Sequence, residues 1–143
     1  MALMKRYSVS ESDFHRIIDA IKEILASQTL ILFAYLHGSF TGKHNFRDID
    51  IAIYVQDLEE SKYMDYEFEL EEILKKKTGF PVDVRILNHA PPYFCYSAIK
   101  SRVILVDRDE NRRADFESLI IRKHLDFLPY RQRYLEEALR SEL

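Results

Sequence analysis

A short run of alternating isoleucines that carries two aspartates constrains this chain more than any other segment. The run is Asp48-Ile49-Asp50-Ile51-Ala52-Ile53. β-Branched residues at alternate positions predict a strand. Successive side chains of a strand point to opposite faces, so the isoleucines share a buried face and the aspartates share the other. Two residues advance about 6.6 Å along a strand, so two like charges stand close together.

A third aspartate interrupts another alternating apolar run. Asp83 lies within the segment 82–87, which is otherwise apolar except for Arg85. If this strand lies beside the first, three carboxylates meet at one site. Mg²⁺ prefers such oxygen ligands, and two ions held this way support in-line displacement at phosphorus. The alternative partner of Asp83 is Arg85, two residues along on the same face.

A glycine–serine pair supplies a candidate phosphate site ahead of the aspartates. Gly38-Ser39 follows the apolar run 30–36, which predicts a buried strand. A glycine at a strand end lets the backbone approach a ligand closely, and Ser39 offers a hydroxyl beside backbone amides that can bind an anion. Lys43 and Arg47 make the following loop cationic. The segment is therefore suited to lie near a nucleotide.

Composition limits the class of protein. A chain of 143 residues with 47% hydrophobic content predicts a single domain over residues 1–143. A net charge of −3 gives no basis for broad nucleic-acid binding, which usually requires a basic face. No apolar run approaches the ~20 residues of a membrane span, so we expect no membrane association. The single cysteine, Cys95, cannot form an internal disulfide and suits a reducing cytoplasm.

The order of predicted elements is α-β-β-α-β-α-β-α, which indicates an α/β (α+β) fold. We expect a small mixed β-sheet with helices packed against one face. A C-terminal helical tail is predicted over about 114–141, and Pro129 should kink or split it. The other helices are expected at 11–27, 58–77 and 91–100, and the strands at 30–36, 48–55, 82–87 and 102–106.

The tail continues to carry aromatic and aliphatic residues beyond Pro129. An exposed apolar stripe there would indicate a partner-binding surface, so we expect a homo- or hetero-oligomer. The alternative is a helix that folds back onto the domain and covers the stripe itself.

Gly38-Ser39, Asp48-Ile49-Asp50 and Asp83 together resemble the signature of the DNA polymerase beta nucleotidyltransferase superfamily. At this length the chain is similar to the minimal branch, in which many members are antitoxins encoded beside a HEPN-domain ribonuclease toxin. The resemblance implies a nucleotidyltransferase fold in which Asp48, Asp50 and Asp83 are catalytic and bind two Mg²⁺ ions. It also implies that Gly38 and Ser39 hold a nucleoside triphosphate.

The same resemblance implies a reaction and a partner. A nucleoside monophosphate, AMP if the donor is ATP, would pass to an acceptor hydroxyl, which in the toxin-paired relatives is a tyrosine of the toxin. Arg47 stands where the family has a small hydroxyl residue, and Lys43 or Arg47 would replace an absent loop arginine in nucleotide binding. We therefore expect an antitoxin enzyme. The alternative is a catalytically weak or inactive module that neutralises its partner by occlusion.

Overall fold

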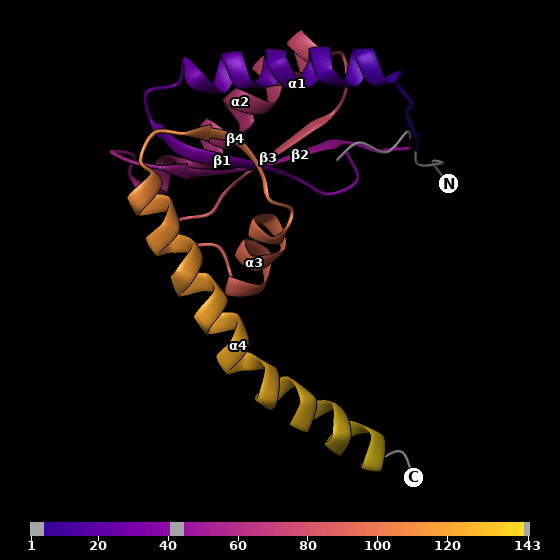
Figure 1. Ribbon diagram of the computed structural model, residues 1–143, viewed down its shortest axis with the longest axis vertical. Helices are drawn as coiled ribbons and strands as arrows, with labels where there is room; N and C mark the ends of the chain where they lie inside the picture. The colour runs from indigo at the N-terminus through magenta and orange to yellow at the C-terminus, as the bar shows by residue number, and fades with distance from the viewer. Residues whose placement is uncertain (1–4, 41–44, 142–143) are drawn as a thin grey trace.

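The computed structural model, described for residues 5–40 and 45–141, contains one four-stranded mixed sheet with the order β3-β2-β1-β4 (Figure 1). Strand β1 pairs antiparallel with β2 and β4, whereas β2 and β3 pair in parallel. A parallel pair needs a crossover connection, and helix α2 supplies it. The elements are α1 (Glu11–Ala26), β1 (Ile31–His37), β2 (Ile49–Val55), η1 (Glu60–Lys62), α2 (Tyr63–Thr78), β3 (Val82–Ile86), α3 (Pro92–Lys100), β4 (Val103–Asp107) and α4 (Glu110–Ser141).

Helices cover both faces of the sheet, so the prediction of helices against one face is wrong. Helices α1 and α2 pack on the face that carries Ile49, Ile51 and Ile53, all fully buried. Helix α3 and the first turns of α4 lie on the other face, as Figure 1 shows. The physical reason lies in β1, whose residues are apolar on both faces and would leave one side in water without a second layer.

Strand β3 forms one edge of the sheet, and two glutamates of α2 bind its outward amides. Glu71 Oε2 accepts a hydrogen bond of 3.0 Å from the Val84 amide, and Glu67 Oε2 accepts one of 2.9 Å from the Ile86 amide. An unpaired edge strand is a template for pairing with another chain. Here the crossover helix satisfies the edge and holds β3 against β2.

Local signals place most helix ends close to their predicted positions. Ser10 Oγ accepts a hydrogen bond from the Asp13 amide at 3.1 Å, which caps α1. Gly79 ends α2 with a φ of 81°. Helix α4 differs from the prediction, because it begins at Glu110 and continues through Pro129 as one helix. Proline has a helical φ, and the exposed position lets the carbonyl four residues earlier turn toward water.

A network of charged groups anchors the start of α4. Arg113 donates to Asp107 Oδ2 at 2.7 Å and to Glu117 Oε1 at 2.9 Å. The Tyr35 hydroxyl donates to the same Glu117 oxygen at 2.6 Å. Burial, followed by the Glu117 carboxylate, raises the pKa of Tyr35, so the phenol stays a donor. The network therefore fixes the direction in which the rest of α4 leaves the domain.

None of the described helices combines the length and apolar character needed to cross a bilayer.

Replacing Arg113 tests this anchor. Arg113→Met should lower the free energy of unfolding by about 2–3 kcal/mol, because the Asp107 and Glu117 carboxylates, whose side chains are each 24% exposed, lose their cation. Urea denaturation followed by circular dichroism measures the change. Arg122→Met, at an exposed position of the same helix, should stay within about 0.5 kcal/mol of the wild type. Equal effects of the two substitutions would show that the network does not hold α4.

Candidate functional site

The strand register brings three polar side chains into one row across the sheet. Asp50 of β2 lies opposite His37 of β1 and opposite Asp83 of β3. Register partners point to the same face, and this is the face that carries α3. Asp48 lies two residues before Asp50 and shares its face. The prediction that the strand of Asp83 neighbours the strand of Asp50 is therefore confirmed.

Negative charge is crowded around Asp50. Burial, the Asp48 carboxylate and the Asp83 carboxylate raise the pKa of Asp50 to about 7, and the nearby Arg47 lowers it. A hydrogen bond between the side chains of Asp50 and Asp48 contributes to the increase. The two carboxyl groups are thus close enough to share a proton, and a divalent cation could take the place of that proton.

Gly38 leaves the space that the Asp50 carboxylate occupies. Its φ is 77°, and a Cβ atom added to it would lie 2.0 Å from Asp50 Oδ2. Gly38 and Ser39 form a turn directly after β1, and the buried Phe40 follows. The ring of Phe40 contacts that of Phe46 at a centroid distance of 4.5 Å, which joins the two ends of the intervening loop. Glycine is therefore required for both backbone conformation and close approach.

Asp83 lies beside the aspartate pair but has partners of its own. Arg85 Nε donates to Asp83 Oδ1 at 3.4 Å, the ion pair foreseen as the alternative for Asp83. Burial raises the pKa of Glu71, the hydrogen bond that its carboxylate accepts from the Val84 amide lowers it, and the hydrogen bond with the side chain of Asp83 raises it again. In the described ranges, no three or more His, Cys, Asp or Glu side chains converge closely enough to hold a metal ion.

The donor set nevertheless suits a hard divalent cation. Asp48 and Asp50 present two contacting carboxylates, and Mg²⁺ is commonly bound by one or two carboxylates together with substrate phosphates and water. The crowding that raises the pKa of Asp50 is the kind of repulsion that a cation removes. The residues present therefore fit the metal, with Asp83 at the side of the pair.

A cavity with two cations borders Asp48. It has a volume of about 400 Å³ and is lined by Lys5, Tyr7, Arg47, Asp48 and Pro81. Tyr7 reaches it through paired backbone hydrogen bonds with Phe46 of 2.8 and 3.1 Å. Lys5 was not foreseen, because no local pattern joins it to a segment some forty residues later. We call this space the cationic cavity. Lys43, the other predicted cation, lies outside the described residues.

His37 of β1 also belongs to the row of side chains that contains Asp50 and Asp83. Its Nε2 atom is buried and has no hydrogen-bond partner within the described part of the chain. Burial lowers the pKa of His37, against the attraction of Asp83 and Asp48, so the ring is neutral near pH 7. Its ring packs edge-on against Phe94 at a centroid distance of 5.4 Å. The imidazole thus joins the carboxylate row to α3.

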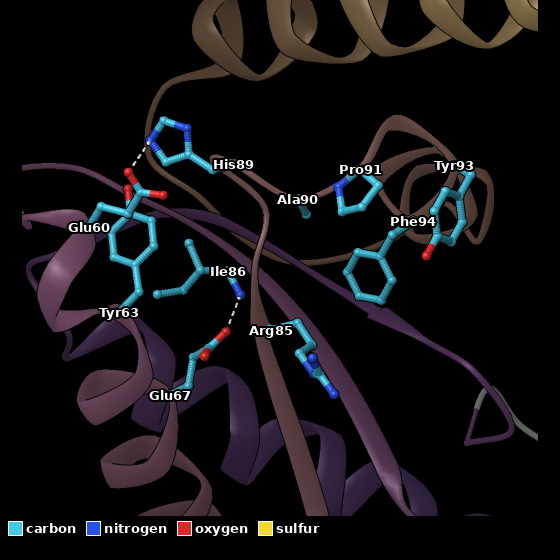
Figure 2. A pocket seen from close by; sticks show the side chains of 10 residues that line it. All are labelled: Glu60, Tyr63, Glu67, Arg85, Ile86, His89, Ala90, Pro91, Tyr93 and Phe94. Atoms are coloured by element: carbon cyan, nitrogen blue, oxygen red, sulfur yellow. Dashed lines mark hydrogen bonds and ion pairs between the residues drawn. The ribbon is translucent and has the colours of Figure 1, made fainter.

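A second cavity of about 460 Å³ lies beyond Asp83. Figure 2 shows Tyr63, Glu60 and His89 on one side, Pro91, Tyr93 and Phe94 on the other, and Arg85 and Ile86 between them. Glu67 and Ala90 complete the lining. The rings of Tyr63 and His89 stack at 5.9 Å. We call this space the aromatic cavity. The sequence did not indicate it, because its residues come from η1, α2, β3, the following loop and α3.

Gly38 and Gly79 both have left-handed backbones, so a comparison of the two tests how closely Asp50 crowds Gly38. Gly79→Ala should destabilise the protein by about 1 kcal/mol, because φ is 81° but no atom lies within 4 Å of the new Cβ. Gly38→Ala should cost clearly more, since its Cβ must also displace the Asp50 carboxylate. Urea denaturation of both variants measures the difference. Equal losses would mean that Asp50 moves aside freely.

The charge crowding predicts the titration of Asp50 in metal-free protein. Carboxyl ¹³C NMR should give a pKa of about 7 for Asp50, and Asp48→Asn should lower it. Because an unfolded aspartate titrates near pH 3.9, Asp50 reduces stability as the pH rises from about 4 to about 7. Asp50→Asn should remove that part of the pH dependence of the free energy of unfolding. A value near 4 in the folded protein would contradict the crowded geometry.

Comparisons with known proteins agree with this geometry. The family model described as "Polymerase beta, Nucleotidyltransferase" matches residues 19–111. No curated protein sequence matches the chain.

Among solved structures, this chain is similar to a chain of a mutant MntA–HpeT toxin–antitoxin. The two are 20% identical, with a TM-score of 0.67, and the match covers 88% of this chain and 98% of that one. A chain of the tri-AMPylated Shewanella oneidensis HEPN toxin in complex with MNT antitoxin shows 20% identity and a TM-score of 0.62 over 90% and 98%. A chain of a toxin–antitoxin with AMP-PNP shows 19% identity and 0.63 over 92% and 99%. At this identity the structures establish a shared fold. The family match covers more than half of the sequence, and the chain belongs to the polymerase beta nucleotidyltransferase family.

Proposed function

We propose that this protein is a Mg²⁺-dependent nucleotidyltransferase that transfers AMP from ATP to a tyrosine hydroxyl of a HEPN-type toxin and so acts as an antitoxin. The observation that carries the proposal is the carboxylate row, in which Asp50 lies between His37 and Asp83 and directly against Gly38. Crowded carboxylates beside a glycine turn suit a metal-bound triphosphate. Family membership supports the reaction class.

Each residue of the site has a distinct role in this proposal. Asp48 and Asp50 hold Mg²⁺, which when bound offsets the negative charge of the phosphates. Gly38 and Ser39 lie against the triphosphate, the hydroxyl of Ser39 and the turn amides donating to its oxygens. Arg47 and Lys5, which line the cationic cavity, bind the outer phosphates. Because of its position in the sequence, Lys43 is also proposed to bind the outer phosphates.

Asp83 is the proposed proton acceptor. The acceptor O–H gives its proton to the Asp83 carboxylate as its oxygen bonds to the α-phosphorus of ATP. The bond from that phosphorus to the oxygen shared with the β-phosphate breaks, and pyrophosphate leaves with the electron pair. Arg85 Nε lies 3.4 Å from Asp83 Oδ1 and so contacts the carboxylate that is proposed to accept the proton.

The distal part of α4 supports a protein partner. The distal part of α4 extends away from the sheet (Figure 1), and exposed apolar side chains recur along one of its faces at the spacing of a helix-packing seam. They are Ile121, Leu125, Leu128, Leu135 and Leu139. The similar structures named above contain a toxin–antitoxin, and one of them an AMPylated HEPN toxin. We therefore propose a hetero-oligomer with the toxin, in the cytoplasm, formed through this face.

Label transfer tests the reaction. Incubation with α-labelled ATP, Mg²⁺ and the HEPN-type toxin proposed as the partner should place label on a tyrosine of that toxin. Asp48→Asn combined with Asp50→Asn should reduce transfer at least about 100-fold, since the metal ligands are lost. Asp57→Asn is the matched control at a position outside the site. Absence of transfer from a confirmed wild-type complex would contradict the proposal.

One observation favours a second function. The long exposed seam of α4 offers a binding surface that needs no chemistry, so the protein would neutralise its partner by occlusion. The double aspartate variant separates the two functions. If it still neutralises the toxin fully at equal concentration, then binding is sufficient. If neutralisation is lost while the complex persists, transfer is required.

A further inference from the structure

The two cavities lie on opposite sides of the row formed by Asp50 and Asp83, displaced from it along the strand direction. The cationic cavity includes Asp48 and Pro81, which precede β2 and β3. The aromatic cavity includes Arg85 and Ile86 at the far end of β3 and continues into α3. Since β2 and β3 run in parallel, the row of Asp50 and Asp83 separates the two spaces.

The separation of the two cavities matches the geometry of in-line displacement at phosphorus. The attacking oxygen and the leaving oxygen must lie on opposite sides of the reacting phosphorus. If the outer phosphates lie in the cationic cavity, then the attacking hydroxyl arrives from the other side. We infer that the aromatic cavity binds the acceptor, and that its occupant is a tyrosine side chain of a polypeptide. The inference rests on the proposed function and assigns its acceptor site.

The lining of the cavity suits a phenol ring. Tyr63 with His89 forms one aromatic wall, and Tyr93 with Phe94 forms the other (Figure 2). Aromatic rings favour stacked or edge-on contacts with one another, and both walls offer such contacts to a phenol ring. Arg85 lies between the walls and contacts Asp83, so a hydroxyl at the inner end of the ring would meet the proposed proton acceptor. Phe94 also contacts His37, which places the wall beside the row itself.

Charge favours a peptide segment over a nucleotide. Glu60 and Glu67 lie in the lining and oppose an anionic phosphate tail, whereas a basic residue beside the tyrosine would be attracted. Both carboxylates are already oriented, Glu67 by the Ile86 amide at 2.9 Å and Glu60 by His89 at 3.9 Å. The same cavity would therefore accept a neutral ring with a basic neighbour.

Continuity with α4 indicates that the ring belongs to a protein. Tyr93 also lines a neighbouring apolar space of about 550 Å³, together with Pro92, Lys123, His124, Asp126, Phe127 and Tyr130. This space joins α3 to the start of the exposed part of α4. A partner that contacts the exposed rings of Phe127 and Tyr130, on a different face of α4 from the stripe of Ile121 and Leu125, thus has a continuous path to the cavity.

A binding measurement tests the cavity without any catalysis. We use N-acetyl-tyrosinamide as the probe, N-acetyl-serinamide as its control, and ¹⁵N NMR of the full chain. The tyrosine probe should shift the amides of Arg85, Ile86, His89, Tyr93 and Phe94, and the serine probe should not. Tyr93→Ala should abolish the shifts; Tyr93 is 73% exposed, so its removal leaves the core intact. Phe68→Ala, an aromatic residue 64% exposed on α2, is the matched control and should bind like the wild type.

Kinetics separate this inference from the proposed function. In label transfer to the protein acceptor, Tyr93→Ala and Arg85→Ala should raise the KM for the acceptor at least tenfold and leave the KM for ATP within twofold. If the wild type transfers nothing, the proposed function fails, and the NMR result still decides whether the cavity binds an aromatic ring. Absence of shifts with the tyrosine probe, or displacement of that probe by AMP from the same amides, would overturn the inference.

Discussion

The parallel register of β2 and β3 is the constraint on which the rest of the site depends. It sets Asp50 beside Asp83, with the cationic cavity on one side of the pair and the aromatic cavity on the other, along the strand direction. The register is held from outside, because Glu67 and Glu71 of the crossover helix bind the amides of the edge strand. The same glutamates that protect the edge thus fix the geometry of the carboxylates, and Glu67 also lines the aromatic cavity.

Helix α4 combines a fixed start with an uncovered end. Arg113 and Glu117 tie its first turns to Tyr35 and Asp107, and Ile120 is its last buried residue. Beyond that point His124 still stacks on Tyr96 of α3 at 3.7 Å, and the rest of the helix extends away from the sheet (Figure 1). A helix that is held at one end and carries an exposed apolar stripe points that stripe in a defined direction. The site and the seam are therefore oriented relative to each other by the same network.

The elements could be predicted closely because each has strong local signals. Alternating isoleucines gave β2, a capped amphipathic stretch gave α1, and Gly79 marked the end of α2. The predictions failed where a distant partner decides the outcome. The second helical layer depends on β1 being apolar on both faces, and the continuity of α4 through Pro129 depends on its exposure. Both are properties of the assembled sheet and its surroundings.

The sequence alone determined the chemistry available to this protein: three aspartates in or beside predicted strands, a glycine at a strand end, and a helical tail whose apolar residues could either bind a partner or fold back onto the domain. Tertiary structure decided where these groups meet. Lys5 reaches the cationic cavity through a bridge between Tyr7 and Phe46, and the aromatic cavity draws its walls from η1, α2, β3, the following loop and α3. Alternation and periodicity act over a few residues, whereas a cavity is a property of elements packed together from distant parts of the chain.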